Sequence, residues 1–176
     1  MIRRSSFLSL LLYSVSIGAF AHETMDLSGQ DITDTELAER LKGHRDVEAL
    51  LLRWTDISDA SLLHLKDLSR LRILSLQGTR ITDAGLKHLR GLRTLQKIHL
   101  DGTKITDDGL EYLKGFTKLE LLGLRDTRVT DVGLEHLVGF RHLESLMLRN
   151  TRVTDAGLVH LTGLLRLQGL NLGIHT

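Results

Sequence analysis

Three side chains that could form a hydrolytic triad occur close together in the middle of the chain. Ser75 and His99 are 24 residues apart, and Asp101 follows two residues after His99. In hydrolases these residue types act as nucleophile, general base and orienting carboxylate. On neighbouring strands Ser75 and His99 would lie about 4.8 Å apart. A shallow sheet offers no oxyanion hole, because its amides bond the next strand, and Arg125 is a simpler partner for Asp101. A hydrolase is therefore our third hypothesis.

Histidine recurs at a second fixed position. The column consists of His64, His88, His136 and His160, with Tyr112 in the remaining place. Stacked imidazoles bind zinc where three or four ligands converge. These residues directly precede leucines expected to be buried on the side opposite the strands, and the tyrosine interrupts them. We therefore predict neither a metal site nor a cofactor. The absence of cysteine excludes disulfides and thiolate ligands.

Two charged columns follow the same spacing. The basic column is Arg80, Lys104, Arg128 and Arg152, and the acidic column is Asp83, Asp107, Asp131 and Asp155. Four stacked cations could form a track for a polyanion, but without counter-charges they would repel one another. We therefore expect the two columns to neutralise each other in solvent and to contribute little to stability.

The single tryptophan, Trp54, follows Arg53 near the end of an expected strand. Tryptophan and arginine are the residue types most enriched at binding hot spots. Trp54 could equally cover the first junction between repeats as part of an N-terminal cap, because tryptophan serves burial as well as binding. The sequence alone leaves both interpretations open.

All of these positions follow from an internal repeat of 24 residues. Five columns keep this step over about a hundred residues, which excludes coincidence. Three of them are Leu52, Leu76, Leu100, Leu124, Leu148 and Leu172; Thr55, Thr79, Thr103, Thr127 and Thr151; and Ile57, Ile81, Ile105, Val129 and Val153.

Each unit predicts one strand and one short helix. Residues 74–77 alternate apolar and polar side chains, which is typical of a half-buried strand. After Asp83 the leucines are three residues apart, which suits a helix that Thr82 and Asp83 cap and Gly91 ends. One strand and one helix cannot bury these leucines alone. The units must therefore stack as a solenoid.

The unit LxxLxLxxTxITDAGLxxLxxL resembles a leucine-rich repeat of the ITDxGL type, which occurs in F-box-associated repeat proteins and in many bacterial exported proteins. The resemblance covers roughly residues 25–172. It implies an α/β solenoid in a horseshoe arc, with about six strand–helix repeats. It also implies that the threonine column takes the family's ladder position and bonds buried turn amides. No F-box precedes the repeats, so we expect no ubiquitin-ligase role.

Residues 1–21 have the three zones of an export signal. Arg3 and Arg4 give a positive start, an apolar stretch follows, and residues 19–21 read Ala-Phe-Ala. A spanning helix needs about 20 strongly apolar residues, and this stretch is shorter and diluted by serines. We therefore predict cleavage before His22, with an uncleaved anchor as the less favoured alternative. The mature chain is expected to be secreted or periplasmic, with no membrane span.

The remaining chain divides into three parts. Residues 22–48 form a degenerate and more polar capping repeat, 49–172 the regular leucine-rich repeats, and 173–176 a truncated end. Ile32 and Ile57 are 25 residues apart, which places one extra residue near Leu41. The last repeat is expected to expose leucines beside an unpaired strand edge, a feature of interfaces or of unstable ends. This predicts end-to-end self-association or a truncated gene product.

The formal net charge of +1 argues against nucleic acid as a partner. We predict a secreted, non-catalytic interaction module that binds a protein or glycan through the concave strand face, as solenoids commonly do. The alternative is a structural protein of the bacterial envelope that self-associates through its C-terminal end. The predicted partner-binding residues are Arg53, Trp54, Gln77, His99, Asp101, Arg125, Met147 and Arg149.

Overall fold

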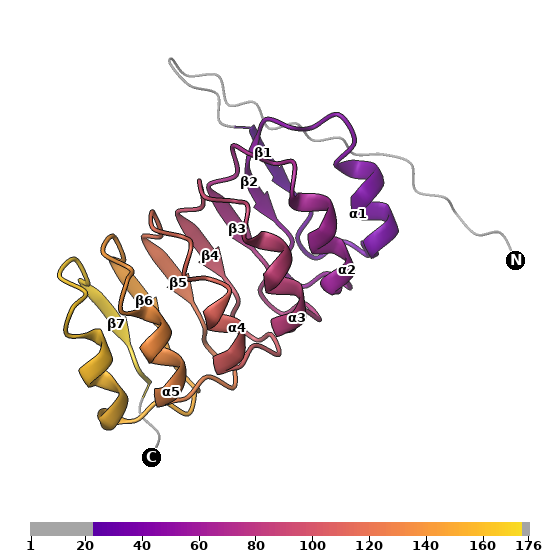
Figure 1. Cartoon of the computed structure of the whole chain (residues 1–176). Helices are drawn as coiled ribbons and strands as arrows, with labels where there is room; N and C mark the ends of the chain where they lie inside the picture. Colours follow the sequence, from indigo (N-terminus) through magenta and orange to yellow (C-terminus); the bar gives the residue numbers. More distant parts are fainter. Residues whose placement is uncertain (1–22, 174–176) are drawn as a thin grey trace, which may run out of the picture.

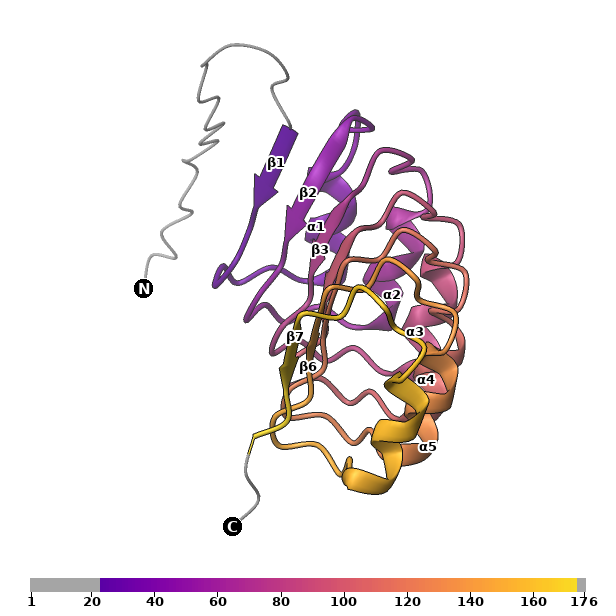
Figure 2. The ribbon, with the colours of Figure 1, turned by 90° about the vertical axis from the view of Figure 1, so that its left-hand side faces the viewer.

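A single parallel sheet, with its strands in chain order, forms one layer of the protein. The computed structural model describes residues 23–173. Figure 1 shows the strands side by side along an arc, and Figure 2 shows the helices together on one face of the sheet. The strands in this part of the chain are β1 (Glu23–Asp26), β2 (Val47–Leu51), β3 (Ile73–Ser75), β4 (Lys97–His99), β5 (Leu121–Gly123), β6 (Ser145–Met147) and β7 (Gly169–Asn171).

Short helical segments connect each strand to the next. Three of those described consist of one α-helical turn that continues into a 3-10 turn. They are α1 (Asp34–Arg40); α2 (Asp59–Leu62) with η1 (Leu63–Leu65); α3 (Asp83–Leu86) with η2 (Lys87–Leu89); α4 (Asp107–Glu111); α5 (Asp131–Leu134) with η3 (Glu135–Leu137); and η4 (Asp155–Leu161). The sequence prediction of an α/β solenoid of strand–helix repeats is confirmed.

The leucines of strand and helix meet between the two layers. In the third repeat Leu74 and Leu76 of the strand segment are fully buried, as are Leu86 and Leu89 of the helical segment. Each such layer packs against its neighbours in one continuous core. The hydrophobic energy of the fold therefore comes from many equivalent small layers.

The first repeat accommodates its extra residue in α1. Leu37 and Leu41 are four residues apart, and the Leu41 amide donates to the Leu37 carbonyl at 3.0 Å. The equivalent leucines of the next repeat, Leu62 and Leu65, are three apart and lie where the α-turn becomes 3-10. An α-helix holds about 3.6 residues per turn and a 3-10 helix about 3.0. The continuous α-helix thus takes up one more residue over the same length.

The threonine column stabilises the turn after each strand, but with a partner other than the predicted one. The Thr79 hydroxyl donates to the Leu76 carbonyl at 2.7 Å. Thr55, Thr103, Thr127 and Thr151 bond the carbonyl three residues earlier in the same way. The prediction of a bond to turn amides was wrong because the buried hydroxyl lies beside the last carbonyl of its own strand segment.

The aspartate at the start of α2, α3, α4 and α5 binds the next repeat. Thr106 donates its amide to Asp83 Oδ1 at 2.9 Å and its hydroxyl to Asp83 Oδ2 at 2.6 Å. We call this paired contact the Asp–Thr clasp. It recurs as Asp59–Thr82, Asp107–Thr130 and Asp131–Thr154. Three members of the acidic column, Asp83, Asp107 and Asp131, therefore bind donors of the following repeat and are not left to solvent as predicted.

The clasp also explains the glycine of the repeat. A Cβ on Gly109 would overlap the Asp83 carboxylate, and Gly85, Gly133 and Gly157 are placed in the same way against the preceding repeat. The position equivalent to Gly85 in the second repeat is Ser61, whose hydroxyl donates to Asp34 at 2.5 Å. A small residue is required here because the neighbouring carboxylate occupies the space.

Replacing Asp107 with alanine tests the clasp. It would leave the Thr130 amide and hydroxyl without their acceptor, so the free energy of unfolding should fall by about 1–3 kcal/mol. Urea denaturation followed by circular dichroism measures this loss. Asp155→Ala is the matched control, because Asp155 starts η4 but accepts no clasp among the described residues. Equal losses in the two variants would contradict the role of the clasp.

Candidate functional site

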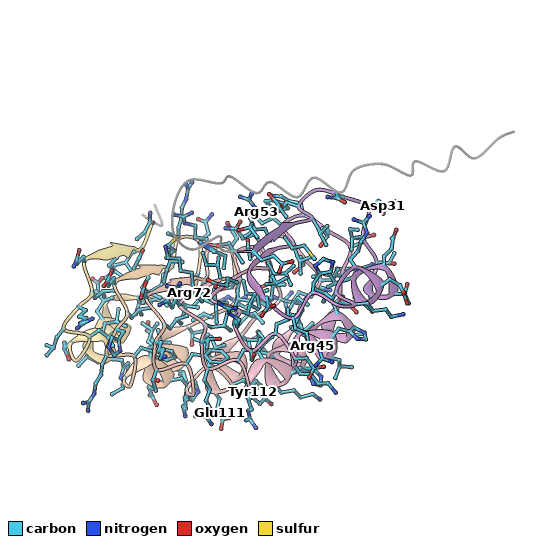
Figure 3. The ribbon with its side chains drawn as sticks, turned by 90° about the horizontal axis from the view of Figure 1, so that it is seen from above. Asp31, Arg45, Arg53, Arg72, Glu111 and Tyr112 are labelled. Atoms are coloured by element: carbon cyan, nitrogen blue, oxygen red, sulfur yellow. The ribbon has the colours of Figure 1, made fainter. Side chains whose placement is uncertain are left out.

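The candidate surface is the face of the sheet turned away from the helices, called here the concave face. Strand pairing places His99 beside Ser75 on one side and Gly123 on the other, and Gly123 beside Met147. Figure 3 shows Arg53 on this side of the molecule and Glu111 and Tyr112 on the helix side. The predicted lateral neighbours across the strands are confirmed.

Three columns of side chains line this face. The second and third contain the predicted positions, which flank the buried leucines. The sequence prediction missed the first column, two residues earlier, although the period of two in a strand places it on the same face. It contains Ile73, Lys97, Leu121 and Ser145, which are half-buried.

Asp101 is the centre of a polar cluster on the concave face. Its carboxylate accepts a hydrogen bond from Gln77 Nε2 at 3.0 Å and one from the Arg125 amide at 3.0 Å. His99 Nδ1 lies 3.8 Å from Asp101 Oδ2, within ion-pair distance if the imidazole is protonated. Gly123 leaves room for the Asp101 carboxylate, because a Cβ at position 123 would lie 2.5 Å from Asp101 Oδ2.

These contacts set the charge of Asp101. Burial acts to raise the pKa of its carboxyl group, since the charged form loses water. The nearby His99 imidazole and the hydrogen bonds from Gln77 and the Arg125 amide favour the charged form and together outweigh burial. The pKa of Asp101 therefore lies below its ordinary value, and the group is a carboxylate at neutral pH.

Three polar atoms around Asp101 are buried without a hydrogen-bond partner in the described residues. They are Ser75 Oγ, His99 Nδ1 and Arg125 Nε. A buried polar group left unpaired costs about 1–3 kcal/mol. Such groups on the outer face of a sheet are therefore candidates for contact with a bound molecule.

The geometry of the same atoms does not support the hydrolase hypothesis. A serine nucleophile needs a hydrogen bond of about 2.6–3.2 Å to its base. Ser75 Oγ has no such bond among the described residues, and the Ser75 side chain is only 2% exposed. The Asp101 carboxylate is held by Gln77 and Arg125 instead. The three residues are neighbours, as predicted, but they do not form a catalytic relay.

The other predicted residues lie around this cluster. Met147 is half-buried and Arg149 is exposed. Arg53 is exposed, and its Nε donates to Ser28 Oγ at 3.5 Å. Trp54 lies in the turn after β2 and is 70% exposed, which favours binding over burial in a cap.

A shallow pocket lies beside Trp54. It has a volume of about 340 Å³ and is lined by Gly29, Gln30, Asp31, Trp54, Thr55, Asp56 and Gly78. The sequence prediction missed Gln30, Asp31 and Asp56. A signal was present, because Asp31 and Asp56 are 25 residues apart and so occupy equivalent positions in the first two repeats.

The histidine column of the helix side shows no metal-binding geometry in the described residues. Within residues 23–173, no group of three or more histidine, aspartate or glutamate side chains is arranged to hold a metal ion. His160 Nε2 lies 3.9 Å from Glu135 Oε1, and Arg90 stacks over the Tyr112 ring at 4.7 Å. Arg80 of the basic column bonds the Asp56 carbonyl at 2.5 Å.

No helix in the described part of the chain is long and apolar enough to cross a bilayer. The predicted export signal, residues 1–21, lies outside the described residues.

Parallel strands on one face, short helices on the other and a fixed repeat define a leucine-rich-repeat solenoid. The family model described as Leucine Rich repeat matches residues 67–89 and 91–114. The described part of the chain thus has the leucine-rich-repeat fold, and its middle carries repeats of that family. No curated protein matches the sequence.

Two solved structures of internalins from Listeria monocytogenes share the fold. Internalin F (inlF) has a TM-score of 0.66 and 24% identity, over 78% of this chain and 37% of that chain. Internalin C2 (inlC2) has a TM-score of 0.59 and 18% identity, over 82% of this chain and 78% of that chain. This protein therefore spans little more than a third of the internalin F chain. At these identities the likeness concerns the fold.

Replacing Gln77 with leucine tests the electrostatics of the cluster. The substitution removes a donor that favours the carboxylate, so the pKa of Asp101 should rise toward the ordinary value of about 3.9. Carboxyl-carbon NMR titration of both proteins measures the two midpoints. A wild-type midpoint at or above the ordinary value would contradict the described geometry.

The same shift predicts how stability depends on pH. Because the folded-state pKa of Asp101 is lowered, its carboxylate stabilises the fold at pH values above the ordinary pKa. This contribution is lost as the pH falls through the lowered value. The stability difference between wild type and Gln77→Leu should shrink over that range.

Proposed function

We propose that this protein is an exported, non-catalytic interaction module that binds a partner on its concave face. The leucine-rich-repeat fold supports the general role, because solenoids present extended surfaces to their ligands. The export signal predicted from residues 1–21 supports its location outside the cytoplasm.

The polar cluster around Asp101 is the observation that carries this proposal. Ser75 Oγ, His99 Nδ1 and Arg125 Nε are buried without partners in the described residues. A bound molecule that displaces the side chains over these atoms, and supplies an acceptor to the Ser75 hydroxyl and to Arg125, would recover much of the cost of burying them. These atoms would then form the centre of the interface, where water is excluded and binding energy concentrates.

The size of the surface favours a protein partner over a single small ligand. From β2 to β6 the concave face extends across four strand spacings, or about 20 Å. Its outer positions combine apolar, basic and acidic side chains, among them Met147, Arg149 and Asp101. We infer that an extended segment of a protein lies across the strands, with polar groups opposite Asp101 and Arg125.

Site-specific photocrosslinking tests this interface. A photoreactive residue at Met147 should capture a defined partner from the native envelope fraction, whereas one at His136 on the helix side should not. The captured partner is then purified, and its Kd is measured for wild type and for Asp101→Ala.

We expect Asp101→Ala to weaken binding about thirtyfold, the effect of a hot spot of about 2 kcal/mol. Glu135→Gln on the helix side serves as the control and should leave the Kd unchanged. Equal losses in both variants, or crosslinking from His136 alone, would contradict the proposal.

Self-association is a second candidate function, favoured by the exposure around β7. All three residues of β7 are exposed, Leu170 at 40%, and the nearby Leu165 is 93% exposed. A strand edge with apolar side chains beside it can pair with another chain. In this alternative, the protein would be a structural envelope component that assembles end to end.

Sedimentation velocity at rising protein concentration separates the two candidates. If the protein assembles through β7, its sedimentation coefficient should increase with concentration, and Leu165→Glu with Leu170→Lys should return it to the monomer value. A single monomeric species at all concentrations would reject assembly through this edge.

A further inference from the structure

Trp54 occupies a backbone position that is unfavourable for a bulky residue. Its φ angle is +57°, in the left-handed region. For large side chains this conformation is strained, whereas glycine, asparagine and aspartate tolerate it. Those are the residue types at the equivalent turns, which are Gly29, Gly78, Gly102, Asp126 and Asn150.

Burial does not compensate for this strain. Trp54 is 70% exposed, and only part of its ring packs on the neighbouring turn. The six-membered ring lies against Gly78, in space that a Cβ there would fill. The structure therefore holds a large aromatic surface toward solvent in a strained conformation, which is more typical of a functional position than of a packing one.

Polar groups surround the exposed ring. Asp31, Asp56 and Gln30 line the same pocket, and the two glycines leave its walls without side chains. The Arg80 guanidinium lies 4.0 Å from the Asp56 carboxylate. The pocket thus combines one aromatic face, the Asp56 carboxylate near Arg80, and the exposed carboxylate of Asp31.

We propose that this pocket binds one sugar ring of a neutral glycan. The carbon–hydrogen face of a pyranose is apolar and slightly positive, so it stacks on the negative face of an aromatic ring. Its hydroxyl groups would donate hydrogen bonds to Asp31 and Asp56 and accept one from the Gln30 amide. The volume of about 340 Å³ falls in the range of small-ligand pockets, about 300–1,000 Å³.

A neutral ligand fits this pocket better than a basic side chain does. A cation could also stack on Trp54 and approach Asp31. However, the Arg80 guanidinium lies 4.0 Å from the Asp56 carboxylate and so weakens the attraction of this side of the pocket for a second cation. A hydroxylated ring uses both carboxylates as acceptors and does not depend on this attraction. The pocket lies beside the concave columns, so this site can act independently of the partner proposed for Asp101.

Tryptophan fluorescence provides a direct test, because Trp54 is the single tryptophan of the chain. The full protein is titrated with chitotetraose, cellotetraose, maltotetraose and mannotetraose, and separately with a tetra-arginine peptide. We expect a saturable change in emission with at least one of the sugars. No change with any sugar up to about 10 mM, or saturation with tetra-arginine alone, would overturn the proposal.

Two substitutions test whether the Asp31 carboxylate binds the sugar. Asp31→Asn should weaken sugar binding about tenfold, the loss expected for one charge-assisted hydrogen bond. Glu39→Gln, which removes an exposed carboxylate from α1 of the same repeat, should leave it unchanged. Equal affinity of Asp31→Asn and wild type would contradict the assigned role of Asp31.

Trp54→Gly separates binding from packing. Glycine relieves the strained backbone, so the thermal midpoint should stay the same or rise, while saturation-transfer NMR should show no contact with the sugar identified above. A large fall in the thermal midpoint would show that the ring is retained for packing and would overturn the proposal. Loss of sugar binding with unchanged partner binding at Asp101 would distinguish this site from the concave face.

Discussion

The Asp–Thr clasp is the contact on which the regularity of the fold depends. Burial of leucine supplies most of the driving force, but it is non-directional and would tolerate many relative positions of two repeats. The clasp is directional, because Asp83 must meet both the amide and the hydroxyl of Thr106. It also requires a small residue such as Gly109 beside the carboxylate. The recurring Thr-Asp-x-Gly pattern is therefore one interaction distributed over two repeats.

The strict register of the repeats determines which side chains are neighbours on the concave face. Since equivalent residues lie side by side, a change at one strand position immediately alters its neighbours across the sheet. Gly123 shows this, because its missing side chain allows the Asp101 carboxylate to lean toward β5 and accept the Arg125 amide. The polar cluster thus arises from three neighbouring repeats that share one framework and differ at single positions.

The sequence predicted the period, the helix caps and the lateral neighbours, because these depend on local patterns and on the repeat itself. It did not predict the clasp, because its donor Thr106 lies 23 residues from Asp83 and so belongs to a different column of the repeat. Nor did it predict that Asp101 would bind Gln77, since both lie in one column of apparently exposed positions. The strain at Trp54 was visible only indirectly, through the glycines at equivalent turns.

The central claim is that the unpaired atoms around Asp101 form the centre of a binding surface. The structure of the protein in complex with its captured partner would test this most directly. The claim predicts polar atoms of the partner within hydrogen-bond distance of Ser75 Oγ and Arg125 Nε, with Asp101 buried beneath them. A partner seated on the helix side, with these atoms still unpaired, would contradict it.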